Sequence, residues 1–158
     1  MEIDAALLND RTPVSIDYAA GDTITITGDE SLEAAGFARI KALNGQNKPF
    51  HLVLNNATQE IPRKAPGDSK FFTWAPNIEN ITNVTLLSIS GPGVQEIDKF
   101  ALRECTVLKS ISFPVAGIIG PYAFEACPFL ENVHLPSVST IEYEGSCARF
   151  LPAPPDSV

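Results

Sequence analysis

The sequence predicts an α/β fold in which a short solenoid of stacked repeats follows an irregular N-terminal cap. Three observations predict it. A segment in the second half of the chain repeats itself at a constant offset, and a strand-like, a helix-like and a second strand-like pattern precede it between positions 22 and 55. The length of 158 residues suits one domain, which can bury about two-thirds of its unfolded surface.

The repeat consists of two copies, IDKFALRECTVLKSISFP and IGPYAFEACPFLENVHLP. Apolar residues, small residues and prolines recur at the same offset of 22 in these pairs: Ile97 and Ile119, Ala101 and Ala123, Cys105 and Cys127, Leu108 and Leu130, Ile111 and Val133, Phe113 and Leu135, Pro114 and Pro136. A period of about 20–29 residues with leucine-like positions is typical of leucine-rich repeats, where each unit supplies one strand and buries its apolar face only by stacking on its neighbours.

The residue types of the second copy are more diagnostic than the length of the repeat. The copy contains an Ile-Gly pair, an Ala-Phe pair, a cysteine, two further apolar positions and a terminal Leu-Pro pair. These residues are Ile119, Gly120, Ala123, Phe124, Cys127, Leu130, Val133, Leu135 and Pro136. This pattern resembles the BspA-like (Treponema-type) leucine-rich-repeat family. The resemblance implies a binding or adhesion module without enzymatic activity, at a cell surface or secreted.

The N-terminal cap is expected to contain two strands and one helix. Residues 1–20 read as a brief helix or loose lead-in that ends in a turn. Asp22–Thr27 alternates polar and apolar residues, which predicts a strand with Ile24 and Ile26 inward. Phe50–Asn55 has the same pattern and predicts a second strand.

Between these strands, residues 31–43 have helical periodicity. Apolar residues recur at helix-like intervals, at Leu32, Ala35, Phe37, Ile40 and Leu43. The helix should end before Asn44-Gly45, which suits a left-handed C-terminal cap, and should cover the open end of the core.

The regular array is expected to run from residue 84 to residue 141. The strand at Val84–Ser90 joins it because Leu86, Ile89 and Pro92 precede the repeat positions Leu108, Ile111 and Pro114 by the same offset, and the pattern breaks after Ile141. Residues 1–83 then form the divergent cap region of a single domain spanning 1–150. The segment 151–158 carries three prolines and predicts a flexible tail.

The three cysteines form no CxxC pair and predict no zinc site. Cys105 and Cys127 occupy the same place in successive repeats, and Cys147 does not continue the series. The two equivalent residues can be buried thiols that act as small hydrophobes. Stacked positions lie about 5 Å apart, so a disulfide is also geometrically allowed.

Several function classes are disfavoured. The formal charge of −8 and the scattered basic residues argue against nucleic acid as a partner. No apolar run approaches the roughly 18 residues of a membrane span, and the acidic start does not resemble a signal peptide. No catalytic, cofactor or metal motif accompanies the two histidines, so neither an enzyme nor a cofactor is predicted.

The remaining candidate for a functional site is a binding surface on the repeat strands. Residues that alternate with inward apolar ones on the repeat strands should point out from the sheet: Ser88, Ser90, Ser110, Ser112, Asn132 and His134. Small polar groups in rows suit a protein or carbohydrate partner. The equally weighted alternative for this strip is a solvated face, with the partner bound elsewhere. A second functional hypothesis is a structural unit that self-associates through an uncapped C-terminal edge.

Overall fold

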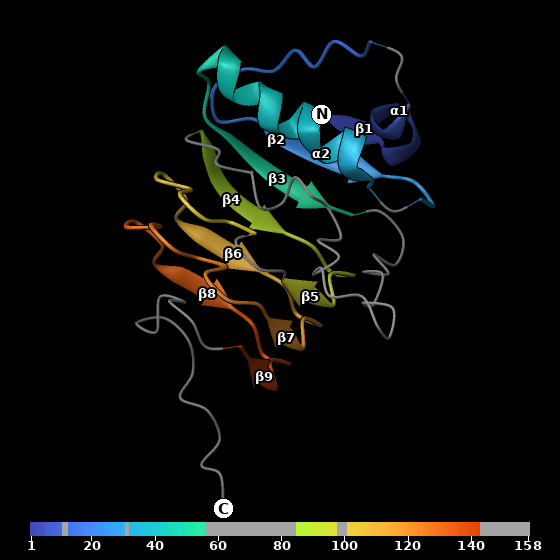
Figure 1. The fold of residues 1–158 in the computed structure, drawn as a ribbon. Coiled ribbons are helices and arrows are strands. Elements are labelled where there is room, and N and C mark those ends of the chain that lie inside the picture. The colour runs from blue at the N-terminus through green and yellow to red at the C-terminus, as the bar shows by residue number, and fades with distance from the viewer. Residues whose placement is uncertain (11–12, 31, 56–84, 98–100, 143–158) are drawn as a thin grey trace, which may run out of the picture.

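The computed structural model describes residues 1–10, 13–30, 32–55, 85–97 and 101–142. Over these ranges it shows a mixed α/β architecture with two parallel sheets and few helices (Figure 1). The predicted tail at 151–158 and the whole segment 56–84 lie outside the described residues.

The large sheet has the strand order β1-β2-β3-β4-β6-β8, and all its neighbouring strands are parallel. Its strands are β1 (Glu2–Asp4), β2 (Thr23–Thr27), β3 (Phe50–Leu54), β4 (Leu86–Ser90), β6 (Ser110–Ser112) and β8 (Asn132–His134). The small sheet is also parallel and contains β5 (Glu96–Ile97), β7 (Ile118–Ile119) and β9 (Thr140–Ile141).

The N-terminus contributes a strand that the sequence did not predict. β1 pairs with β2, and its last residue, Asp4, caps the short helix α1 (Ala5–Asn9) by accepting a hydrogen bond from the Ala6 N–H at 2.9 Å. A side-chain acceptor at this position satisfies a donor that the first helical turn leaves open. The predicted strand β2 is confirmed, with Ile24 and Ile26 fully buried.

Helix α2 (Ala34–Ala42) continues into the 3₁₀ turn η1 (Leu43–Gln46). The α-helix ends at Ala42, before Asn44-Gly45 as predicted. The expected left-handed cap at Asn44-Gly45 is wrong, because the chain tightens into a 3₁₀ turn there and the left-handed residue is Asn47, with φ of 54°. Ala35 was expected on the apolar stripe but is exposed. Gly36 faces α1 instead, and a Cβ there would come within 3 Å of the Leu32 and Asn9 side chains.

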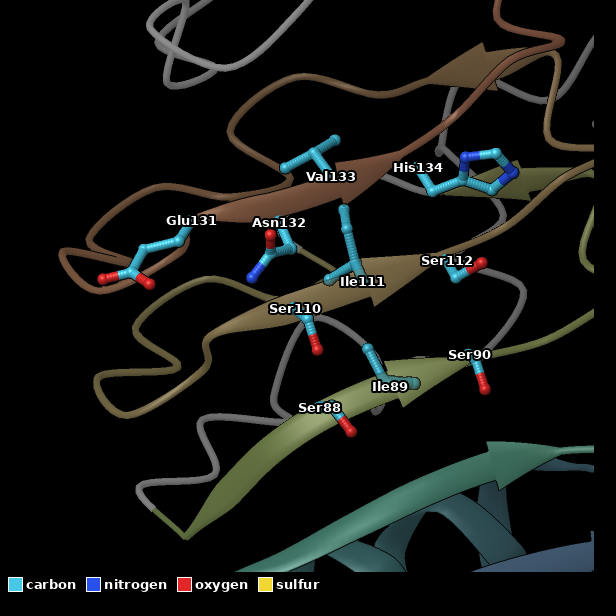
Figure 2. A pocket seen from close by; sticks show the side chains of 10 residues that line it. All are labelled: Ser88, Ile89, Ser90, Ser110, Ile111, Ser112, Glu131, Asn132, Val133 and His134. Atoms are coloured by element: carbon cyan, nitrogen blue, oxygen red, sulfur yellow. The ribbon is translucent and has the colours of Figure 1, made fainter.

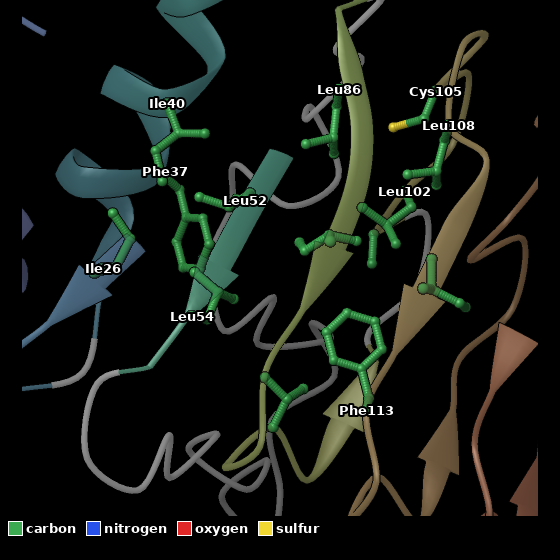
Figure 3. Packing of buried hydrophobic residues seen from close by; sticks show 14 of the residues in the cluster. Ile26, Phe37, Ile40, Leu52, Leu54, Leu86, Leu102, Cys105, Leu108 and Phe113 are labelled. Atoms are coloured by element: carbon green, nitrogen blue, oxygen red, sulfur yellow. The ribbon is translucent and has the colours of Figure 1, made fainter. Parts of the chain in front are cut away.

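Figure 3 shows how α2 meets the large sheet. Phe37 and Ile40 lie beside Ile26, Leu52 and Leu54, which point from β2 and β3 toward the helix. All five side chains are buried in one cluster that continues through the rest of the molecule. The helix thus closes the N-terminal part of the core from the side opposite the sheet.

The second half of the molecule has a constant strand register. β4 pairs with β6 and β6 with β8, so that Ser88, Ser110 and Asn132 are neighbours across the sheet. The small sheet follows the same rule, because Ile97 pairs with Ile119 and Ile119 with Ile141. In every one of these pairs the sequence offset is that of the repeat, so the repeat sets the register of both sheets. We call residues 85–97 and 101–142 the repeat stack.

The turns between the two sheets are also in register. The Leu102 N–H donates to the Ala123 carbonyl at 2.8 Å, and the Glu104 N–H donates to the Glu125 carbonyl at 2.7 Å. Glu104 and Ala126, which occupy equivalent positions in successive repeats, both have positive φ angles, of 60° and 57°. The repeat therefore reproduces backbone conformation in the turns as well as in the strands.

Candidate functional site

The six residues that the sequence singled out lie on one face of the large sheet. They form two rows that cross β4, β6 and β8, the first with Ser88, Ser110 and Asn132, the second with Ser90, Ser112 and His134. We call this surface the polar strand face. Figure 2 shows the serine side chains pointing away from the isoleucines that separate them.

The alternation along each strand explains this placement. Ile89 and Ile111 are buried, whereas the serines on either side of them are half-buried, and Asn132 and His134 are exposed. Successive side chains of a strand point to opposite faces, so the apolar residues hold the strands on the core while the polar residues face outward. Neighbouring residues within a row lie about 4.8 Å apart, the spacing of paired strands.

The polar strand face lines an open hollow of about 660 Å³. Its described lining consists of the six polar residues, the intervening Ile89, Ile111 and Val133, and Glu131, which immediately precedes β8. Among the described lining residues Glu131 alone carries a formal charge when histidine is counted as neutral. Hydroxyl, amide and imidazole groups can both donate and accept hydrogen bonds, so the hollow suits an uncharged or weakly charged polar ligand.

A residue that sequence reasoning left out of the site joins it from β3. His51 pairs with Ser88 across β3 and β4, and its Nδ1 lies 2.6 Å from the Ser88 Oγ. On the other side His51 pairs with Thr23 of β2. The first row therefore continues from the repeat stack onto the N-terminal strands, and the order across the sheet is Thr23, His51, Ser88, Ser110, Asn132.

The His51 and Ser88 pair places an imidazole against a serine hydroxyl, as nucleophilic enzymes do. Such chemistry also uses a third group that orients the imidazole and donors for the developing oxyanion. Among the described residues, Ser88 is the one side chain that hydrogen-bonds the His51 ring. Ser88 also lies in the middle of a strand on an open face. The contact positions the two side chains against each other on neighbouring strands.

Neither a metal centre nor a membrane-spanning helix is present in the described part of the chain. Among residues 1–10, 13–30, 32–55, 85–97 and 101–142, no group of three or more His, Cys, Asp or Glu side chains is placed to hold a metal ion. Within these ranges no helix has the length and apolar character needed to cross a bilayer. Comparisons with protein-family models, with curated proteins and with solved structures find no match to the chain.

Proposed function

We propose that this protein is a small leucine-rich-repeat solenoid of the BspA-like type, with an irregular N-terminal cap, that binds a protein or carbohydrate partner without catalysing a reaction. The constant register of the two parallel sheets supports the repeat assignment, since stacked units of equal length pair in this way. The cell surface or an extracellular site is the proposed location, on the strength of the sequence resemblance.

One observation carries the binding proposal. All six predicted residues line the same open hollow, in two rows on adjacent strands. A partner lying across β4, β6 and β8 would meet one hydrogen-bonding side chain wherever a row crosses a strand. Because the hollow is open and almost uncharged, affinity would come from several such bonds together, each contributing about 0.5–1.5 kcal/mol.

The test uses a quadruple variant, in which Ser110, Ser112, Asn132 and His134 are all replaced by alanine. The matched control replaces Gln95 and Thr106, which are exposed and lie outside the hollow. Binding of each protein to a glycan array and to purified extracellular matrix proteins is measured by surface plasmon resonance. The quadruple variant should lose about 30-fold or more in affinity, while the control should bind as the unsubstituted chain does.

Binding that survives in the quadruple variant would show that the polar strand face is not the binding surface. An unsubstituted chain that binds no member of either panel would count against the function itself. Circular dichroism of all three proteins establishes that the substitutions leave the fold intact.

A second candidate function is self-association through the C-terminal edge. Among the described strands, β8 and β9 end their sheets on the same side of the molecule. The partly buried apolar residues that pack on the core at this end are Val133, Val138 and Ile141. If this edge pairs with a second copy, sedimentation velocity should reveal a self-associated species that Ile141→Lys disperses. A monomer at high concentration would rule the edge out.

A further inference from the structure

The two cysteines of the repeat stack occupy equivalent positions and are not joined in a disulfide. Cys105 is fully buried and Cys127 is 3% exposed. Both belong to the turns that lead from the small sheet back to the large sheet. Neither cysteine lines the hollow of the polar strand face.

Backbone hydrogen bonds hold these two turns side by side. The pairs Leu102 with Ala123 and Glu104 with Glu125 bridge the turns just before the cysteines. Parallel backbones bonded in this way lie about 4.8 Å apart. Disulfides join Cα atoms about 4.4–6.8 Å apart, so the spacing of the turns falls within the range that a disulfide requires.

The thiol of Cys127 already points toward Cys105. Its Sγ donates to the Leu102 carbonyl at 3.0 Å, and the same carbonyl accepts the Cys105 N–H at 3.3 Å. One oxygen atom is thus shared by the side chain of one cysteine and the backbone of the other. Because both side chains are buried in the same core cluster, they lie on the same side of the paired turns.

The surroundings of Cys127 also favour its reactive form. Hydrogen bonds from the side chain and backbone of Cys105 lower the pKa of the Cys127 thiol below its usual value, and they outweigh the opposing effect of burial. The thiolate is the nucleophile in oxidation and in disulfide exchange. Of the two residues, Cys127 is also the one that retains some exposure.

We propose that Cys105 and Cys127 form a redox modification site whose oxidant is a small peroxide and whose product is an intramolecular disulfide. The Cys127 thiolate attacks one peroxide oxygen and becomes a sulfenic acid as hydroxide leaves and takes up a proton to form water. The Cys105 sulfur then attacks the sulfenic sulfur, and the second water leaves with the Cys105 proton. Two thiols are oxidised and one hydrogen peroxide is reduced to two waters.

The product would join two successive units of the repeat stack. A disulfide between equivalent positions of neighbouring units closes a loop in the unfolded chain and reduces its conformational freedom. The oxidised protein should therefore unfold at a higher temperature than the reduced protein. A dithiol reductant should reverse the change once it reaches the bond.

The test treats the 158-residue chain with hydrogen peroxide in a Cys147→Ser background, so that no third thiol competes. After quenching, the protein is denatured, alkylated and digested for mass spectrometry. We expect a cross-linked peptide pair that contains residues 105 and 127 and is lighter by two hydrogens. The midpoint temperature of thermal unfolding should rise by about 5 °C or more, and it should return to the value of the reduced protein after treatment with dithiothreitol.

Cys105→Ser and Cys127→Ser in the same background are the matched controls. Neither variant should show the rise in unfolding temperature. In the Cys105→Ser protein, oxidation should stop at a sulfenic or sulfinic acid on Cys127. The proposal is overturned if both thiols remain open to alkylation at peroxide concentrations that oxidise a small thiol. It is also overturned if Cys127 passes to sulfinic acid while Cys105 is present. If a substituted chain does not fold, the same peptide map on the unsubstituted protein decides the outcome.

Discussion

The N-terminal region up to residue 55 and the repeat stack belong to one large sheet but are built differently. β2 and β3 have five residues each and are joined through α2, whereas β6 and β8 have three residues and follow turns. The sequence offset between paired positions changes from 23 for Glu2 and Thr25 to 28 for Thr23 and His51. In the repeat stack this offset is constant.

A continuous parallel sheet therefore does not need units of constant length. Each strand keeps its place because its inward residues, such as Ile24, Leu52 and Ile111, enter one shared core. The connection between strands can then be a helix or a turn, provided that something covers the inner face. In the N-terminal region α2 provides that cover, and in the repeat stack the turns and the small sheet provide it.

The largest expected effect tests whether the two regions unfold together. Phe37 is fully buried where α2 meets the sheet, so Phe37→Ala should cost about 3–5 kcal/mol of the free energy of unfolding. Because the core is one cluster, circular dichroism during urea unfolding should show a single transition shifted to lower urea. Leu108→Ala in the repeat stack is the matched control and should shift the same transition. Two separate transitions would show that the regions are independent.

Leu130→Ala tests the last described turn of the repeat stack. Leu130 is 1% exposed and occupies the repeat position equivalent to that of the fully buried Leu108. If it is stacked core, the substitution should cost about 2–5 kcal/mol in urea unfolding. A cost below about 0.5 kcal/mol would contradict its placement and would mean that the repeat stack is loose at this end.

An alanine-to-glycine substitution should have opposite signs in the two regions. Ala126 is exposed and has a φ of 57°, a conformation that glycine adopts more easily, so Ala126→Gly should stabilise the protein by about 0.5–1 kcal/mol. Ala35 is exposed within α2, where glycine should instead cost about 0.5–1 kcal/mol. Thermal unfolding of the two variants measures both. A loss of stability in the Ala126→Gly protein would argue against the repeated turn conformation.

An effect of similar size concerns two residues, Tyr18 and Lys48, that hydrogen-bond each other in the N-terminal region. The Tyr18 hydroxyl donates to the Lys48 carbonyl at 2.9 Å, and the Lys48 Nζ donates to the Tyr18 carbonyl at 2.9 Å. Burial raises the pKa of Tyr18 above its usual value. The contribution of the neutral hydroxyl is therefore complete below the unfolded-state pKa of about 10 and is lost as the pH rises through the higher folded-state pKa.

Tyr18→Phe should lower the free energy of unfolding by about 0.5–1.5 kcal/mol at neutral pH and should flatten its decline above about pH 10. Urea unfolding at a series of pH values measures both effects. Tyr122→Phe is the control for removal of a tyrosine hydroxyl elsewhere, and it should keep the alkaline decline. An equal decline in the Tyr18→Phe protein would mean that Tyr18 does not cause it.

The sequence predicted the repeat stack well because its evidence is the repeat itself. Residues at equal offsets become neighbours in a parallel sheet, so the pairing of Ser88, Ser110 and Asn132 followed from the offset alone. The small sheet was not predicted, although Ile97, Ile119 and Ile141 are equivalent repeat positions. Its strands are too short to show alternation.

The N-terminal part of the candidate site could not be predicted. His51 meets Ser88 only because β3 pairs with β4 through a register shift between Phe50 and His51, and the two residues lie far apart in the sequence. No periodicity specifies that separation. The strand β1 was missed for a related reason, since so short a segment forms a strand only where a neighbour such as β2 is available to pair with it.

The constant register has a consequence for how such a protein can change over generations. Duplication of one repeat unit between Ser88 and Asn132 would add one strand to the large sheet, one to the small sheet and one residue to each polar row. The backbone hydrogen bonds that join successive units would form again between the original unit and its copy. The His51 and Ser88 contact would stay unchanged at its boundary. A single recombination event could thus lengthen the polar strand face without a new fold.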